Sequence, residues 1–130
     1  LVANPGCYAT AVLLALTPVA AEIEPTGVVV DAKSGMTGAG RSLRASSHAG
    51  AVLENVTPYR VGAHQHAPEI AAHLGFPVTF VPHLLPVRRG LLATCVVRSR
   101  GADLRELLEQ YYAESHVVDV LPAPLDLHRG

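Results

Sequence analysis

An apolar run near the start of the chain constrains the fold most. It extends from Ala11 to Leu16 without a polar residue, and Pro18, a residue that ends or kinks a helix, follows it. A helix that is apolar nearly all round is typical of the interior of a protein. We therefore expect a buried helix from about Pro5 to Thr17.

The residues before this run suit a helix start that carries a cysteine. Asn4 is a good N-cap, and Pro5 then falls at the first helical position, while Gly6 lets another group approach the backbone closely. Cys7 lies in the first turn, at the positive end of the helix dipole, where a thiol loses its proton more easily. A cysteine beside an apolar run is also commonly a small core residue, so the rest of the chain must decide.

Composition limits the classes of protein that the chain can belong to. With 130 residues, 49% of them hydrophobic and 16% charged, one ordered domain is expected. The sequence shows no basic stripe of the kind that binds nucleic acid, and no apolar stretch reaches membrane-spanning length. The two cysteines, Cys7 and Cys95, do not make a disulfide scaffold, which favours a reducing, cytoplasmic setting; the alternating apolar pattern around Cys95 makes it a core residue.

The remaining elements follow from periodicity and from turn residues. We expect a Gly-rich loop at 33–41, whose amides form either an anion nest or a flexible turn, and a mobile or ligand-ordered stretch at 42–56. The order of these elements predicts an α+β fold, with a mixed and largely antiparallel sheet that has helices on one face. The expected strands are 28–32, 77–82, 90–100 and 117–121, and the expected further helices are 19–23, 68–74 and 104–113, the last capped by residues 101–103.

A second constellation lies around two histidines. His64 and His66 share a face if their segment is extended, but a metal site needs further ligands, and nothing fixes Glu69 or His73 in that role. We predict no metal. The stronger use is one histidine facing Cys7, because cysteine catalysis needs a thiolate, an imidazole and amides aimed at the developing oxyanion. Fixed guanidiniums suited to an anionic acyl substrate are available from Arg41, Arg88 and Arg89.

Four motifs lie in order along the chain: Val2–Ala11, Ser34-Gly35 with Gly38–Arg41, His64–Ile70, and Pro82–Leu84 with Arg89-Gly90. Together they resemble the N-acetyl-gamma-glutamyl-phosphate reductase family of arginine biosynthesis, within the aspartate-semialdehyde-dehydrogenase-like superfamily. Gln65 stands where that family often has arginine, and Ala9 where proline is frequent.

The resemblance implies a reaction. Cys7 attacks an acyl phosphate and expels phosphate, NADPH reduces the resulting thioester, and the aldehyde is released. It implies His64 as the acid/base, and Ser34 and Gly35 near the nicotinamide. The residues implied to contact substrate or phosphate are Asn4, Arg41, Tyr59, His66 and Arg89.

The resemblance also implies a fold like the C-terminal domain of glyceraldehyde-3-phosphate dehydrogenase. The chain corresponds to the inserted catalytic and dimerisation domain, so we expect residues 1–130 to be a fragment of a longer chain. Its NADP-binding Rossmann domain would be absent here, and the isolated fragment inactive. We expect a homo-oligomer formed through the sheet face, a small acyl-phosphate substrate, and neither a nucleic-acid nor a membrane partner.

Three other functions remain open at this point. A related aminoadipyl-phosphate reductase of lysine biosynthesis would use the same motifs. A cysteine hydrolase would need a carboxylate to orient the histidine, and only Asp31 and Glu69 are candidates. A non-catalytic dimerisation module would not need Cys7.

Overall fold

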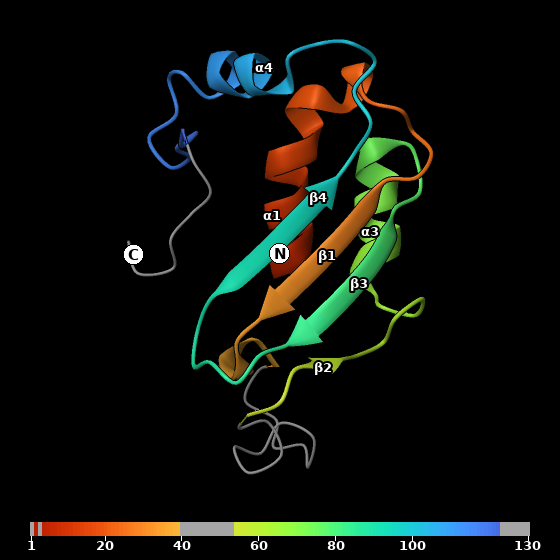
Figure 1. The fold of residues 1–130 in the computed structure, drawn as a ribbon. Helices are drawn as coiled ribbons and strands as arrows, with labels where there is room; N and C mark the ends of the chain where they lie inside the picture. Colours follow the sequence, from red (N-terminus) through yellow and green to blue (C-terminus); the bar gives the residue numbers. More distant parts are fainter. Residues whose placement is uncertain (1, 3, 40–53, 123–130) are drawn as a thin grey trace.

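The protein is described from a computed structural model, which places residues 2, 4–39 and 54–122 (Figure 1). Arg41 and most of the 42–56 stretch lie outside these residues. None of the described helices is long and apolar enough to cross a membrane. The elements are α1 (Cys7–Leu16), η1 (Thr17–Glu22), β1 (Val29–Ser34), η2 (Met36–Ala39), β2 (Thr57–Pro58), α3 (His66–Leu74), β3 (Thr79–Leu84), β4 (Leu91–Val96) and α4 (Leu104–Tyr111).

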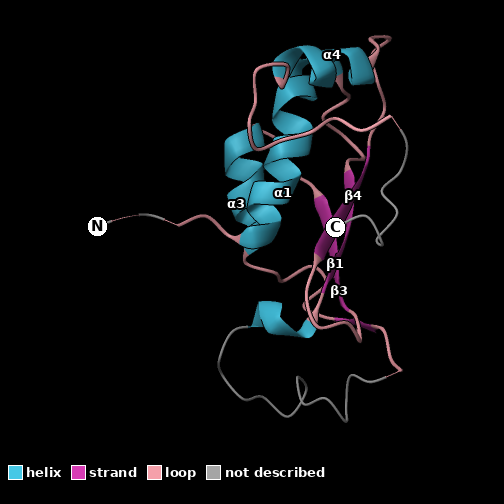
Figure 2. Ribbon diagram, turned by 90° about the vertical axis from the view of Figure 1, so that its left-hand side faces the viewer, coloured by secondary structure: helices cyan, strands magenta, loops and turns pink. Residues whose placement is uncertain are grey.

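The sheet is mixed, as the sequence predicts. Its strand order is β2-β3-β1-β4, with β1 parallel to β3 and antiparallel to β4, and with the two-residue β2 antiparallel to β3. Helices α1 and α3 lie side by side against one face, and α4 lies beyond one end of the sheet (Figures 1 and 2). Both α1 and α3 begin toward the end of the sheet where β1 and β3 finish (Figure 1).

The core forms between this helix pair and the sheet. One side of α1 is fully buried, and alternate residues of β1 point toward it, as the alternation of buried and half-buried positions along that strand shows. Cys95 packs against the same core, as predicted, and burial raises the pKa of its thiol to about 11. The buried core residues are Tyr8, Ala9, Val12, Leu16, Val19, Ile23, Val28, Val30, Ala32, Ile70 and Phe80.

Helix α1 differs from its prediction in two respects. Its N-cap is Gly6 rather than Asn4, because the Gly6 carbonyl accepts the first helical bond from the Thr10 amide at 2.9 Å. Asn4 and Pro5 therefore precede the helix. The helix is also not buried all round, since Leu14 remains 42% exposed on the side away from the sheet.

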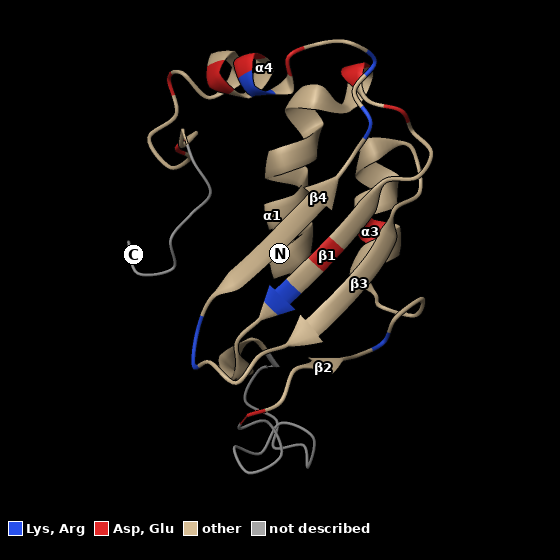
Figure 3. Cartoon of the chain, viewed as in Figure 1, with Lys and Arg blue, Asp and Glu red and all other residues tan. Residues whose placement is uncertain are grey.

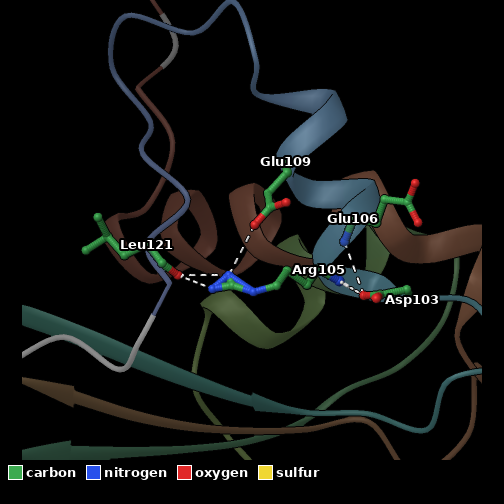
Figure 4. A network of polar contacts seen from close by, with 5 residues as sticks. All are labelled: Asp103, Arg105, Glu106, Glu109 and Leu121. Atoms are coloured by element: carbon green, nitrogen blue, oxygen red, sulfur yellow. Dashed lines mark hydrogen bonds and ion pairs between the residues drawn. The ribbon is translucent and has the colours of Figure 1, made fainter.

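The strand predicted at 117–121 is not formed. The Ser115 hydroxyl accepts bonds from the amides of Val117 and Val118, at 3.3 and 3.0 Å, and so turns the chain locally. Arg105 of α4 then donates to the Leu121 carbonyl. These contacts hold the segment beside α4 and away from the sheet (Figure 4).

Other boundaries move by a few residues. The predicted helix at 19–23 is a 3-10 turn that directly continues α1, and α3 begins at His66, two residues before the predicted start. Strands β1 and β3 each begin and end a little later than expected, while β4 is shorter than the predicted 90–100 strand. The predicted helix over 104–113 is α4, and Asp103 caps it as expected.

Candidate active site

Cys7 is the first residue of α1 and is exposed. No side chain caps this helix, so the amides of its first turn have no partner within the helix or from a capping group. Donors of this kind suit an oxyanion that develops beside the sulfur. The predicted position of Cys7 in the first turn is confirmed, and the alternative of a core cysteine does not apply to it.

His66 lies against the residue that precedes this cysteine. A Cβ atom placed on Gly6 would lie 2.5 Å from His66 Cδ2 and 2.8 Å from Cε1, and closer still to Nε2. The expected close approach at Gly6 is therefore real, and the approaching group is an imidazole. His66 is the first residue of α3, so the start of α3 lies against the start of α1.

His64 lies deeper, among aromatic rings. Only 7% of it is exposed, and its ring centroid is 5.9 Å from that of Tyr8, 5.5 Å from Tyr59 and 5.0 Å from Phe80. Its Nδ1 accepts a bond from the His66 amide at 3.2 Å, which places the proton of the neutral ring on Nε2.

The charge state of His64 follows from these surroundings. Burial is the main cause that lowers its pKa from the usual 6.5, and nearby His66 and Arg60 lower it further. His64 is therefore neutral at pH 7, and its acceptor nitrogen is engaged by the His66 amide.

No hydrogen bond joins the Cys7 thiol to either imidazole within the described part of the chain. His66 contacts Gly6, the residue next to Cys7, whereas the contacts of His64 are with the rings of Tyr8 and His66. Catalytic hydrogen bonds are often long before substrate binds, so both imidazoles stay candidates and the packing favours His66.

Tyr59, expected at the substrate, points toward Tyr8. The Tyr59 hydroxyl donates to the Tyr8 hydroxyl at 3.4 Å. Burial raises the pKa of Tyr8 well above its usual range, Tyr59 adds to the rise, and a bond with the Ser34 hydroxyl opposes it. Ser34, the last residue of β1, thus forms a hydrogen bond with Tyr8, the residue that follows Cys7.

The Gly-rich segment does not form the predicted anion nest at residues 35–38. All four amides donate to carbonyls, those of Gly90, Val87, Arg88 and Gly35, at 2.9, 2.9, 3.3 and 3.2 Å respectively. Gly35 packs so closely on the 87–89 turn that a Cβ there would lie 2.9 Å from backbone atoms. This segment is a 3-10 turn anchored to a neighbouring loop.

The other predicted contact residues are less closely gathered. Arg88 and Arg89 are exposed in the turn that packs on Gly35, and Asn4 is exposed before α1. Within residues 4–39 and 54–122, no group of three or more His, Cys, Asp or Glu side chains is arranged to hold a metal ion.

The structure adds one residue that sequence reasoning did not connect with the thiol. Glu69 accepts a hydrogen bond from the Gly6 amide at 3.1 Å. A usable signal was present, because Glu69 follows His66 by three residues and such residues share one face of a helix.

Two comparisons with known proteins find sequences similar to this chain. The chain matches the family model described as semialdehyde dehydrogenase, dimerisation domain, over residues 7–128. It is 50% identical over 125 residues to a protein of Salinispora arenicola, and 46% identical over 134 residues to one of Desulforudis audaxviator. A third relative, from Clostridium botulinum, is 41% identical over 134 residues.

All three relatives are named N-acetyl-gamma-glutamyl-phosphate reductase. The matches cover 93–94% of this chain but only 38–39% of the relatives. The chain thus spans about two fifths of the length of these proteins. The match over 7–128, which includes Cys7 and both histidines, shows that the chain belongs to the semialdehyde dehydrogenase dimerisation-domain family.

Proposed function

We propose that the chain is the cysteine-bearing part of an NADP-dependent reductase of arginine biosynthesis. Its reaction would convert N-acetyl-gamma-glutamyl phosphate to N-acetylglutamate semialdehyde and release phosphate. The names of the relatives support this substrate. One observation carries the proposal, namely an exposed Cys7 at the uncapped start of α1 with the His66 imidazole packed against the preceding residue.

The geometry suits acyl transfer to the thiol. The Cys7 sulfur attacks the acyl carbon, an S–C bond forms, and phosphate leaves with the electrons of the C–O bond. The first-turn amides of α1 stabilise the oxyanion, while an imidazole takes the thiol proton and later returns it to the oxyanion of the reduced adduct. The resemblance suggests His64 for this role, and the contacts with Gly6 favour His66.

The nicotinamide, when bound, supplies the hydride that reduces the thioester. An exposed Cys7 is accessible to such a group. Ser34 and Gly35 are buried, and the Gly35 amide is bonded to the Gly90 carbonyl, so Gly35 offers no free amide to a dinucleotide. We therefore propose that the cofactor is held mainly by sequence in the three fifths of the relatives that the chain does not span.

The substrate contacts proposed for Asn4, Arg41, Tyr59, His66 and Arg89 rest on the resemblance. The exposed Arg89 guanidinium can bind two oxygens of a phosphate or carboxylate in parallel. The related aminoadipyl-phosphate reductase stays an alternative. Assays of the complete protein in the reverse direction with both semialdehydes separate the two substrates.

The hydrolase alternative loses its orienting carboxylate. Asp31 bonds to Lys33 at 2.5 Å and lies 3.2 Å from His83 Nδ1, on strands that bring it to neither His64 nor His66. Glu69 accepts the Gly6 amide. Neither of the two candidate carboxylates is thus engaged with an imidazole of the site, which favours the reductase.

The test is turnover by the complete protein that contains this chain. Cys7→Ser should reduce NADPH-dependent turnover by several orders of magnitude, as the loss of a nucleophile does, whereas Cys95→Ser should retain most of it because Cys95 packs in the core. Turnover by Cys7→Ser close to that of the parent would overturn the proposal and favour a non-catalytic dimerisation module.

We also propose that a second copy of the chain covers the open face of the sheet. Residues that point away from the helices include Leu92, which is 43% exposed, and Val96, which is 56% exposed. Few charged positions interrupt this face (Figure 3), and they include Asp31 and Lys33 on β1, which neutralise each other. An apolar sheet face of this kind is typical of an interface, and the family description names dimerisation.

A further inference from the structure

The hydrogen bond between Gly6 and Glu69 joins the starts of two helices. The Gly6 amide donates to Glu69 Oε1 at 3.1 Å, across 63 positions of sequence. Gly6 is the N-cap of α1, and Glu69 lies in the first turn of α3. One carboxylate of α3 therefore fixes the backbone immediately before Cys7.

The same turn of α3 also supplies His66. Its ring occupies the space that a side chain at position 6 would need, so α3 contacts Gly6 twice, through an imidazole and through a carboxylate. The two contacts determine how the helix start is oriented relative to that imidazole. A shift at Gly6 would move the Cys7 sulfur with it, because the two residues are covalently adjacent.

We propose that Glu69 is a positioning residue, which holds the Cys7 thiol in register with the His66 imidazole by accepting the Gly6 amide. This inference rests on the proposed function, with His66 as the imidazole that exchanges a proton with that thiol. The acceptor oxygen is the part of Glu69 that matters. Its negative charge is not required, because any acceptor oxygen at that position can bind the Gly6 amide.

A purely structural role is the competing explanation. A glutamate in the first turn of a helix stabilises that helix through its dipole, and this would apply to α3 whether or not Cys7 is nearby. Glu106 provides the matched control, because it lies in the first turn of α4, is exposed, and accepts only from Gln110 among the described residues.

The experiment measures alkylation of Cys7 by iodoacetamide, resolved by mass spectrometry, in the complete protein near pH 7 and near pH 10. Cys95, which is partly buried against the core, is the internal reference thiol. The single variants are Glu69→Ala, Glu69→Gln, Glu106→Ala, His64→Ala and His66→Ala, and Glu69→Ala is also combined with His66→Ala. Urea unfolding confirms that each variant is folded.

We expect Glu69→Ala to slow Cys7 alkylation at neutral pH about tenfold, the scale of losing one hydrogen bond. Glu69→Gln keeps an acceptor oxygen and should react at least as fast as the parent. The deficit of Glu69→Ala should vanish near pH 10, where thiols ionise unaided, and Glu106→Ala should react as the parent does. In the His66→Ala background, Glu69→Ala should add little, because the two residues act as one unit.

Three results would overturn the inference: a parent-like rate for Glu69→Ala, an equal loss in Glu69→Gln, or independent effects of Glu69 and His66. Failure of the proposed function has a different signature. There, His64 and His66 variants both leave Cys7 alkylation unchanged, and Cys7→Ser retains turnover.

Discussion

Gly6 shows how one small residue makes the site possible. Its Cβ position is occupied by the His66 ring, so Gly6→Ala must displace either the imidazole or the start of α1. We expect a loss of about 1–3 kcal/mol in the free energy of unfolding, as for other overpacked sites. We also expect the folded variant to lose turnover, because the imidazole and the thiol no longer keep their relative positions.

Gly38→Ala is the matched control for this substitution. A Cβ at Gly38 would lie 3.5 Å from Ser34 Oγ, an ordinary contact. Urea unfolding and steady-state kinetics measure both variants. Parent-like stability and turnover in Gly6→Ala would contradict the packing of His66 described above.

His64 predicts a pH dependence of stability. Its pKa is lowered in the folded protein, chiefly by burial, so the unfolded chain binds more protons as the pH falls below the usual 6.5. The contribution of His64 is therefore fully present above about pH 6.5 and is lost as the pH falls toward the folded-state value.

The measurement is urea unfolding of the parent and of His64→Gln at pH 7.5 and pH 5.5. We expect the parent to lose more stability between these two pH values than His64→Gln does. His73→Gln, at an exposed position of α3, should behave as the parent. Equal losses in the parent and in His64→Gln would contradict a buried neutral imidazole.

The sequence could place a histidine near Cys7 but could not show which one. The prediction that His64 and His66 share a face assumed an extended segment. Residues 60–63 instead form a turn, closed by the Ala63 amide on the Arg60 carbonyl at 3.0 Å, and α3 begins at His66. A local hydrogen bond between the two histidines, rather than strand alternation, sets where each ring goes.

At the scale of elements, α4 is the helix whose start was most predictable. The Asp103 side chain accepts bonds from the amides of Arg105 and Glu106, at 3.0 and 3.2 Å (Figure 4). We expect Asp103→Ala to cost about 1 kcal/mol in the free energy of unfolding. Asp103→Asn, which keeps an acceptor oxygen, should cost less.

Asp119→Ala, at an exposed position after α4, is the control for this prediction. Urea unfolding measures all three variants. Equal stabilities of Asp103→Ala and Asp119→Ala would show that the cap contributes nothing to α4.

Elements fixed by local chemistry were predictable, and those fixed by distant partners were not. Asp103 and the β-branched run of β1 carry their own signals. The 117–121 segment has an equally good strand pattern, but Arg105 and Ser115 hold it beside α4. The acceptors of the amides of 35–37 could not be predicted either, because they lie some fifty residues later, in the 87–90 turn.

Within the described residues, α1 and α3 cover one face of the sheet and leave the other face open (Figure 2). The α+β class and the mixed sheet could be predicted from the order of elements, whereas the strand order β2-β3-β1-β4 could not, since β2 is only two residues long. The parallel pairing of β1 with β3 places the starts of α1 and α3 at the same end of the sheet (Figure 1). This arrangement brings together His66, Glu69 and Cys7.

The open face predicts an effect on association. Leu92→Glu and Val96→Glu each place a charge on β4 at an exposed apolar position of that face, so we expect either variant to shift the complete protein toward monomer in sedimentation velocity. Val61→Glu introduces the same charge at a position that is 55% exposed in a turn, and it should leave association unchanged. An unaltered sedimentation coefficient in both β4 variants would contradict the proposed interface.

In the proposed reaction, Cys7 carries the acyl group as a thioester. The complete protein is incubated with N-acetyl-gamma-glutamyl phosphate without cofactor, quenched in acid, and analysed by peptide mass spectrometry. We predict an N-acetylglutamyl adduct on the peptide that contains Cys7, together with an equivalent amount of released phosphate. An unmodified Cys7 peptide in a protein that still turns over, or an adduct at another residue, would contradict the account.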